Sequence, residues 1–209
     1  MKPASVPTSL ALVIAVAGLP AHANDEVSYT YAEASYVRSS VDVGSTSIDG
    51  DGGRGELSIE FPGNIYAIGS FELNDLDVLP GLPTVDLDIL TAGVGWHTHL
   101  SGEGDGVMGF KQDRWSLFAE ARFIQYDTGV TTDGYKARVG TRVVNHTNFE
   151  FLGAIGYEDI EDSNGDLTLE ARLLYSVTNS VQIQVGVDWF EDFTRGFAGV
   201  RFDFGSITR

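Results

Sequence analysis

Apolar and polar residues alternate along most of the chain beyond its first 26 positions. Within 181–189, valine, isoleucine and tryptophan take the odd positions, while glutamine, glycine and aspartate take the even ones. Within 54–61, Leu57, Ile59 and Phe61 similarly alternate with Glu56 and other polar residues. A two-residue period gives a β-strand two unlike faces, whereas a helix needs a period of 3.6. The pattern therefore predicts an all-β protein.

Ten segments carry this alternation, and most have the length that a tilted strand needs to cross a membrane, about 9–11 residues. The predicted strands are Val27–Arg38, Arg54–Phe61, Ile65–Asn74, Leu87–His97, Arg114–Tyr126, Tyr135–Val144, Phe149–Tyr157, Leu167–Ser176, Val181–Phe190 and Arg195–Phe204. We expect a single closed, antiparallel, up-and-down transmembrane barrel of about ten strands, with eight as the alternative.

The connections between these segments alternate in length. Short turns are expected at Pro62–Asn64, Asn145–Asn148 and Val177–Ser180. Longer and more acidic loops are expected at Ser39–Gly53, Asp75–Asp86, Asp127–Gly134, Glu158–Asp166 and Glu191–Thr194. Bacterial barrels have short periplasmic turns and longer external loops. The Gly-rich connection Thr98–Asp113 departs from this rule, because it is long where a short turn is expected.

The N-terminus has the three parts of a secretory signal peptide in the right order. Lys2 gives a positive start, Leu10–Leu19 is a short apolar run, and Ala21–Ala23 is a small-x-small cleavage site. Such a run is too short to span a bilayer as a helix. We therefore predict a signal peptide at 1–23 and a barrel domain at 24–209. No other stretch is apolar for long enough to form a transmembrane helix.

Alternation alone does not separate a soluble sandwich or lipocalin-like carrier from a membrane barrel, since either has one apolar face. The signal peptide and the strand lengths favour the membrane barrel, and the C-terminus does so as well. Gly199, Phe202 and Phe204 resemble the closing-strand signal that the barrel assembly machinery recognises in outer-membrane proteins. In that family the chain usually ends on the aromatic residue, whereas here Gly205–Arg209 follow Phe204.

Several segments resemble a family of small outer-membrane β-barrels of xanthomonad-like gamma-proteobacteria, loosely grouped with OmpA- and OmpX-like, porin-like barrels. The resemblance is carried by Val27–Glu33, Ala92–Trp96, Asp133–Gly140, Gly156–Asp159 and Phe197–Phe202. It covers nearly the whole mature chain, and it implies location in the bacterial outer membrane. These motifs belong to strands and turns, and the family has no agreed catalytic residue to carry over to this sequence.

Composition narrows the choice of partners. The formal net charge is −17, which argues against nucleic acid, because polyphosphate would be repelled. The chain has no cysteine, so disulfides do not hold this exported protein together. The partners that we expect are outer-membrane lipid, lipopolysaccharide and the barrel assembly machinery. We expect no cofactor.

In a membrane barrel the polar strand faces line the interior, and here they carry charges of both signs. The predicted charge network of the lumen consists of Glu33, Glu56, Glu60, Glu72, Glu120, Arg122, Lys136, Arg138, Arg142, Glu170, Arg172 and Arg201. About eight strands leave room only for side chains, whereas porins with open channels have about 16. We expect a barrel filled by ion pairs, with a structural or surface-interaction role. The alternative is a narrow porin that passes small solutes or cations.

The predicted outer loops are acidic. Their carboxylates are Asp42, Asp49, Asp51, Asp75, Asp77, Asp86, Glu158, Asp159, Glu161, Asp162 and Asp166. Oxygen ligands of this kind can bind divalent cations, which could bridge the loops to lipopolysaccharide phosphates. The segment 162–166 (DSNGD) resembles part of a calcium loop but fails as an EF-hand, because Ile160 and Ala171 occupy ligand positions. We predict no dedicated metal site and interpret the loops as solvated.

An enzyme is the least favoured interpretation. Barrels that deacylate lipid A use a His-x-Ser pair with a carboxylate, and His99-Leu100-Ser101 has that spacing. It lies in the Gly-rich connection with no nameable partner. His97 and His99 share a face, but two ligands do not make a metal site. Ten-stranded barrels that cleave peptides have larger external domains than this chain offers. We therefore expect no enzymatic activity.

Overall fold

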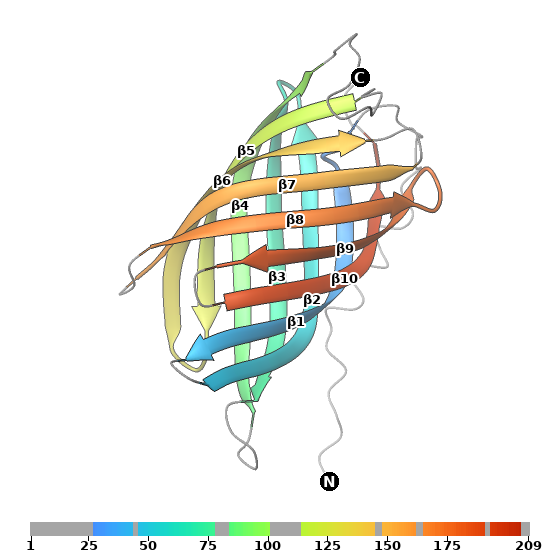
Figure 1. Ribbon diagram of the computed structural model, residues 1–209. Helices are drawn as coiled ribbons and strands as arrows, with labels where there is room; N and C mark the ends of the chain where they lie inside the picture. Colours follow the sequence, from blue (N-terminus) through green and yellow to red (C-terminus); the bar gives the residue numbers. More distant parts are fainter. Residues whose placement is uncertain are drawn as a thin grey trace, which may run out of the picture.

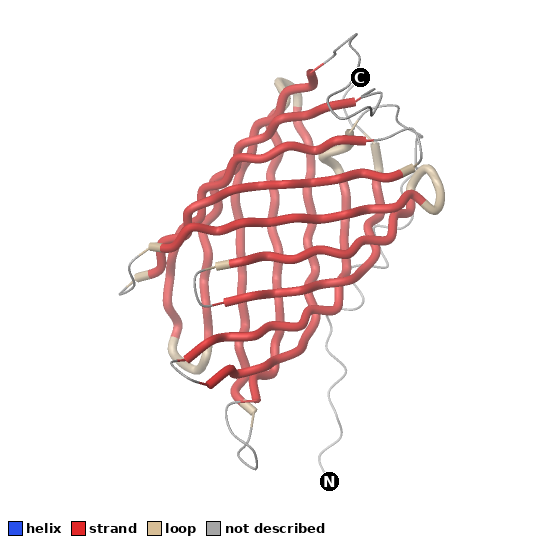
Figure 2. The backbone as a smooth tube through the Cα atoms, viewed as in Figure 1, coloured by secondary structure: helices blue, strands red, loops and turns tan. Residues whose placement is uncertain are grey.

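The computed structural model describes residues 27–43, 46–77, 84–100, 114–144, 148–161, 165–190 and 193–205. Nearly all of them lie in ten β-strands (Figures 1 and 2). The strands are β1 (Tyr31–Val43), β2 (Thr46–Phe61), β3 (Ile65–Asp77), β4 (Val85–Leu100), β5 (Arg114–Asp127), β6 (Thr131–Val144), β7 (Phe149–Ile160), β8 (Asp166–Ser176), β9 (Val181–Trp189) and β10 (Phe193–Asp203). The prediction of an all-β chain with ten strands, rather than eight, is confirmed.

Each strand pairs antiparallel with its neighbours in sequence, and β1 pairs with β10 to close the barrel. The closing register runs from Tyr31 opposite Asp203 to Val41 opposite Phe193. Closure leaves no unpaired strand edge, which a barrel in lipid requires. We call the end where β1 begins and β10 ends the terminal end, and the opposite end the distal end. In Figure 1 the distal end lies at the lower left, where the β1–β2 hairpin turns.

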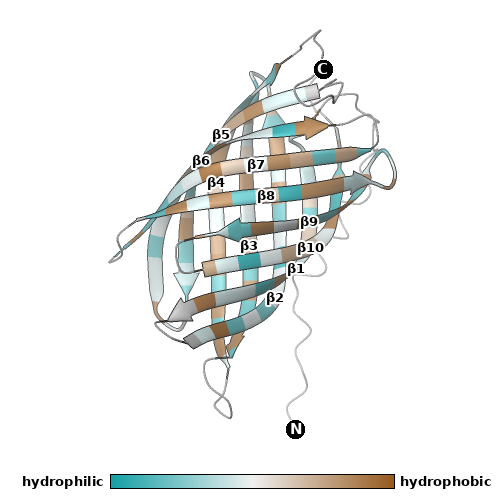
Figure 3. Ribbon diagram, viewed as in Figure 1, coloured by the Kyte–Doolittle hydropathy of each residue, from teal (hydrophilic) through white to brown (hydrophobic). Residues whose placement is uncertain are grey.

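The side chains are distributed inside out relative to a soluble protein. Val94, Val139 and Val185 are each more than half exposed on the outer surface, while Arg172 and Arg201 are buried in the lumen. Figure 3 shows hydrophobic and hydrophilic residues interspersed along the strands. Apolar side chains that face outward all around a barrel need lipid, and such barrels belong to outer membranes. The protein is an outer-membrane β-barrel, and not a soluble sandwich or carrier.

Two predicted loops proved to be mostly strand. β1 continues to Val43 and β2 starts at Thr46, so the expected loop Ser39–Gly53 is a paired hairpin. β3 and β4 likewise extend into the expected loop Asp75–Asp86. The apolar alternation stops in these segments, but backbone pairing does not depend on it. The strands therefore extend beyond their apolar stretches at the distal end.

The first predicted strand was wrong at its start. Val27–Thr30 precedes β1 and lies buried at the terminal end of the lumen instead of in the wall. Ser58 of β2 donates a hydrogen bond to the Tyr29 carbonyl at 2.7 Å, and the Glu60 amide donates to Thr30 Oγ1 at 3.1 Å. The alternation in 27–31 resembled a strand, but the segment makes scattered hydrogen bonds with the inner side of the barrel instead of pairing along a neighbouring strand.

The turn at Pro62–Asn64 is confirmed between β2 and β3, with Gly63 and Asn64 at φ values of 89° and 61°. Glycine and asparagine are the residues that enter this left-handed region most readily. The signal peptide at 1–23, most of the Gly-rich connection (101–113), residues 145–147 and 191–192, and the last four residues of the chain lie outside the described residues. The described part of the chain contains no helix of the length and hydropathy that spanning a bilayer requires.

Candidate functional site: the charged lumen

A network of ion pairs fills the middle of the lumen. The register of neighbouring strands places some of its acids and bases opposite one another. Glu120 of β5 stands directly opposite Arg138 of β6, and Glu120 Oε2 lies 2.7 Å from Arg138 Nε. Arg122, two residues further along β5, therefore faces the same side and donates from Nε to the same oxygen at 2.9 Å. Acids and bases at matching heights on neighbouring strands thus pair along the wall.

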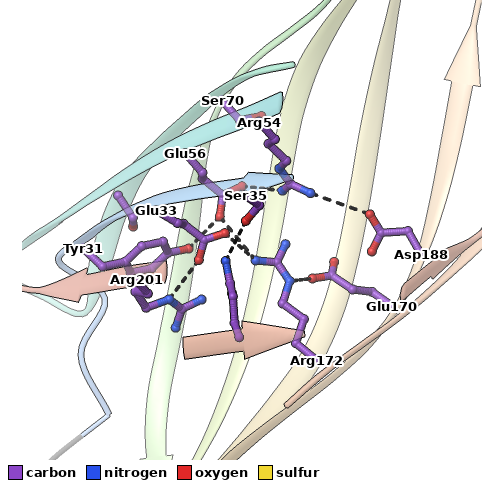
Figure 4. A network of polar contacts seen from close by, with 12 residues as sticks. Tyr31, Glu33, Ser35, Arg54, Glu56, Ser70, Glu170, Arg172, Asp188 and Arg201 are labelled. Atoms are coloured by element: carbon purple, nitrogen blue, oxygen red, sulfur yellow. Dashed lines mark hydrogen bonds and ion pairs between the residues drawn. The ribbon is translucent and has the colours of Figure 1, made fainter. Parts of the chain in front are cut away.

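The network also crosses the barrel. Arg122 donates to Glu56 of β2 at 2.9 Å, and Arg138 pairs with Glu170 of β8. Glu33 of β1 accepts hydrogen bonds from Arg172 of β8 at 2.8 Å and from Arg201 of β10 at 2.9 Å. Arg201 reaches Glu33 from the adjacent strand, but the other pairs join strands that are not neighbours in the wall, so their side chains meet in the lumen (Figure 4).

Two phenol groups complete the hydrogen bonding of the buried carboxylates. Tyr31 donates to Glu56 at 2.9 Å, and Tyr66 donates to Glu120 at 2.7 Å. The guanidinium carbon of Arg201 also lies 4.1 Å from the centre of the Tyr31 ring, a cation–π distance. Buried charges are tolerated when they are both paired and hydrogen-bonded, and these carboxylates have both kinds of contact.

The structure places every residue of the predicted charge network inside the barrel. Eight of the twelve meet in the central network: Glu33, Glu56, Glu120, Arg122, Arg138, Glu170, Arg172 and Arg201. The other four pair outside the predicted set. Glu60 contacts His97 at 3.0 Å, Glu72 contacts Arg195 at 3.0 Å, Lys136 contacts Glu158 at 3.2 Å, and Arg142 contacts Glu150 at 2.6 Å.

The sequence interpretation missed five charged residues of the lumen: Arg54, Glu150, Glu158, Asp188 and Arg195. Each lies within two residues of the start or end of a predicted strand, and Glu158 was assigned to an outer loop. Arg54, Glu150, Asp188 and Arg195 lie inside predicted strands on the polar face, so the two-residue period within those strands already places them in the lumen. Only Glu158 lies beyond a predicted strand, by one residue. The prediction that Glu158 belongs to a solvated outer loop was wrong, because Glu158 is buried in the lumen beside Lys136.

A second feature closes the terminal end of the lumen. We call Val27–Thr30 the N-terminal plug. The Tyr29 ring stacks on His97 with 4.0 Å between ring centres, and the Arg142 guanidinium carbon lies 4.7 Å from the Tyr29 centre. Arg142 also donates to the Ser28 carbonyl, and Tyr29 OH lies 2.8 Å from Ser116 Oγ. The plug packs in an apolar cluster with Tyr66, Ile68, Phe118 and Leu152.

A small cavity lies in the distal half of the lumen. Its wall includes Tyr126, Asp188 and Arg195, which stand near the distal ends of β5, β9 and β10. The space open to the centres of water-sized molecules is about 40 Å³. Since one water needs about 10–15 Å³ on this measure, the cavity holds about three waters. It is too small to be the bore of a general porin.

The acidic residues of the distal hairpins face outward. Asp51 stands opposite Asp75, and Asp75 stands opposite Asp86, in neighbouring strands. Among the described side chains, no group of three or more Asp, Glu, His or Cys residues is arranged to hold a metal ion. Residues 162–164 of the calcium-like segment 162–166 and the side chain of Asp42 lie outside the described residues.

The residues considered for catalysis do not meet in a described site. His97 is fully buried and contacts Glu60, while His99 packs against His97 with 4.9 Å between ring centres. Ser101 lies outside the described residues.

Gly199 of the predicted assembly signal is held at the closing seam. It stands opposite Ser35 of β1, and a Cβ atom there would lie 2.2 Å from the Ala34 carbonyl oxygen. Phe202 pairs opposite Ala32, and the Phe204 amide donates to the Thr30 carbonyl at 3.0 Å just beyond β10. These contacts give Gly199 a packing role in closure. Recognition by the assembly machinery stays a prediction.

No family model and no curated protein matches the sequence. Among solved structures, similar folds include the KdgM porin in complex with disordered oligogalacturonate, with a TM-score of 0.42 and 12% identity over 82% of this chain and 99% of that one. Neisserial surface protein A has a TM-score of 0.42 and 13% identity, over 85% and 98%. The transport unit of the autotransporter AIDA-I from Escherichia coli has a TM-score of 0.46 and 10% identity, over 94% and 97%. At these identities the likeness is one of fold alone.

Proposed function

We propose that this protein is a sealed outer-membrane barrel with a structural or surface-interaction role, and not a solute channel or an enzyme. The observation that carries the proposal is the ion-pair network across the lumen, in which Glu33 bridges Arg172 and Arg201 from different strands. A solute would have to break several buried pairs to pass. Separating a buried pair leaves charge without compensation, and removing one partner costs about 3–5 kcal/mol of stability.

The N-terminal plug supports the same proposal independently. It fills the terminal end with aromatic stacking between Tyr29 and His97 and with backbone hydrogen bonds to Ser58 and Arg142. The narrow porin remains the alternative function, because the distal cavity gives part of the lumen some free space. In that alternative the network would rearrange to admit small solutes.

Solute flux into proteoliposomes tests the proposal. Vesicles that contain the wild-type protein should swell in arabinose no faster than empty vesicles. An opened variant, with Glu56, Glu120, Arg122 and Arg138 replaced by serine and Tyr29 by alanine, removes equal numbers of acids and bases and should admit the sugar. Swelling by wild type at the rate of the opened variant would favour the porin. Retention of the heat-modifiable gel shift shows that both proteins are folded barrels.

We propose that the surface role lies with the acidic hairpins at the distal end, on the outer side of the membrane. Asp49, Asp51, Asp75, Asp77 and Asp86 are exposed on the outward face, where lipopolysaccharide phosphates would surround the barrel. Divalent cations could bridge these two sets of anions. We also propose that the protein belongs to the group of small barrels of xanthomonad-like bacteria. The sequence motifs that resemble that group support this assignment.

Thermal stability with and without Mg²⁺ tests the bridging. In bilayers that contain lipopolysaccharide, removal of Mg²⁺ by EDTA should lower the unfolding temperature of wild type. The effect should be much smaller for a variant with Asp49, Asp51, Asp75, Asp77 and Asp86 changed to asparagine. Equal sensitivity of both proteins would overturn the bridging role.

A further inference from the structure

The charged side chains in the wall of the distal cavity are all paired, but some polar atoms of the wall lack a hydrogen-bond partner. Five basic and four acidic side chains contribute to its wall, and Glu56 of the central network offsets the remaining formal charge of +1. Arg195 contacts both Glu72 and Asp188, at 3.0 and 2.7 Å. Lys136 contacts Glu158 at 3.2 Å. The remaining charged groups of the wall pair within the central network or with Asp188. A charged ligand would therefore unbalance a neutralised site.

Hydrogen-bonding capacity remains among the buried groups of this wall. Arg54 Nη1 and Asp188 Oδ1 make no hydrogen bond among the described residues, although both side chains are more than nine-tenths buried. Arg54 Nη1 lies 3.7 Å from the other carboxylate oxygen of Asp188 (Figure 4). Ser70 and Thr91 share one hydrogen bond of 2.8 Å, which uses only one of their two hydroxyl hydrogens. The wall thus offers a donor and an acceptor side by side.

Buried polar groups without partners are costly, at about 1–3 kcal/mol each, so a molecule that pairs with both kinds is favoured. A hydroxyl group can accept from Arg54 and donate to Asp188 in the same position. It brings no charge, so no ion pair has to break.

Size and surroundings further limit the ligand. Three waters occupy about 90 Å³ in the liquid, which is close to the volume of a small polyol or of one diol edge of a sugar. Apolar surface is also present, because Ile89 and Ile124 line the cavity. Phe190 lies over two of the lining cations, with Lys136 Nζ 4.8 Å from its ring centre. A polyol has carbon surface for such contacts and hydroxyls for the polar wall.

We propose that the distal cavity is a binding site for a neutral polyhydroxyl group, such as a small polyol or a diol edge of a saccharide, that enters from the distal end. Binding would place ligand hydroxyls between Arg54 and Asp188. The N-terminal plug lies at the opposite end of the lumen, so the bound group would return by the way it came. The site does not depend on the sealed-barrel proposal, because a conducting barrel could also hold a polyol there.

Ligand-observed NMR titration of the folded protein in detergent micelles tests the site with three probes of similar size. Glycerol is neutral, glycerate is its anionic counterpart, and serinol is its cationic counterpart. Glycerol should bind measurably above empty micelles, and both charged probes should bind at least about tenfold more weakly. The inference is overturned if glycerol does not exceed the empty-micelle signal, or if either charged probe binds as tightly.

Two cavity-filling variants locate the binding. Ser70→Met and Thr91→Leu occupy the cavity and keep every ion pair, so each should abolish the glycerol signal. Gln182→Met is the matched control, because Gln182 is buried inside the barrel but does not line the cavity. It should bind glycerol like wild type. Glycerol binding that survives in both filled variants, once their gel shift shows folded barrels, would place the ligand elsewhere and overturn the site.

Discussion

Glu33 illustrates how single residues hold this barrel together. Its two carboxylate oxygens accept from Arg172 and Arg201, and all three side chains are buried. The benefit of a buried ion pair over apolar packing is small, but the loss of one partner is expensive, because it leaves charge without compensation. The contribution of Glu33 is therefore best measured by removing it while both arginines remain.

Glu33→Gln should lower the free energy of unfolding by about 3–5 kcal/mol, because two buried guanidinium groups each lose one of their carboxylate partners. Urea unfolding of the protein in lipid vesicles, followed by tryptophan fluorescence, measures this change. Asp49→Asn is the control: Asp49 pairs with Arg38 at 3.9 Å on the exposed surface, where an ion pair contributes about 0–1 kcal/mol. Similar losses in the two variants would contradict the role of the buried network.

Gly199 makes a second prediction at the residue scale. Gly199→Ala should reduce the folded, heat-modifiable fraction on gels, because its Cβ would meet the Ala34 carbonyl oxygen at the β1–β10 seam. Gly196→Ala is the matched control in the same strand, since a Cβ at Gly196 meets nothing within 4 Å. If both variants fold as well as wild type, the seam does not require glycine at this position.

Strand pairing at the distal end continues where the sequence suggested loops. The alternation of apolar residues reveals which strand face meets lipid, so it ends where the apolar surroundings end. β1 to β4 nevertheless stay paired beyond that level, and their outward aspartates stand opposite one another. Sequence periodicity therefore predicted the number and order of the strands but not how far the hairpins extend.

Like charges directly opposite in a sheet are destabilising, by roughly 0.2–1 kcal/mol per pair. Asp75 faces Asp51 on one side and Asp86 on the other. Asp75→Asn should therefore raise the free energy of unfolding at low salt, and the gain should shrink at 1 M salt as screening increases. Asp159→Asn removes the same charge opposite Tyr135 and should give no such gain. A salt-independent effect would point to a cause other than charge repulsion.

The charged lumen could be predicted as far as the sequence shows which residues share a strand face, that is, the parity of their positions. Parity placed Glu120 and Arg138 inside, because their neighbours on each strand are apolar. It gave no partners, since pairing across the barrel depends on which strands face each other after closure. It also failed for the N-terminal plug, because Val27, Tyr29 and Tyr31 alternate as a strand would, yet the chain turns into the lumen before Tyr31.

At the scale of the whole molecule, basic side chains gather in the lumen, whereas acidic side chains occur both there and on the outside. The described basic side chains point into the lumen, apart from exposed Arg38, and acids there balance them. Most of the net charge of −17 is thus carried outside the lumen. The belt between the two ends is apolar on its outer face, which fits a barrel that is held in lipid by its surface and filled by its ion pairs.

A charged residue on that belt should destabilise the barrel, and more so the deeper it lies in the membrane. Val139→Arg, in the middle of β6 on the outer face, should destabilise the barrel in vesicles by about 2–4 kcal/mol. Leu167→Arg, near the distal end of β8, should cost about 0–1 kcal/mol because that level is close to the membrane interface. Both side chains are more than half exposed, so packing does not explain a difference. Equal costs would contradict the membrane placement.

Single-channel recording in a planar lipid bilayer tests the sealed lumen most directly. The purified wild-type barrel, verified as folded by its gel shift, should give no steps above the background of the bare bilayer at 1 M KCl. The opened variant, with the four central charges changed to serine and Tyr29 to alanine, should give steps under the same conditions. Steady, reproducible steps from wild type would contradict the account, because ions would then pass the buried network and the N-terminal plug.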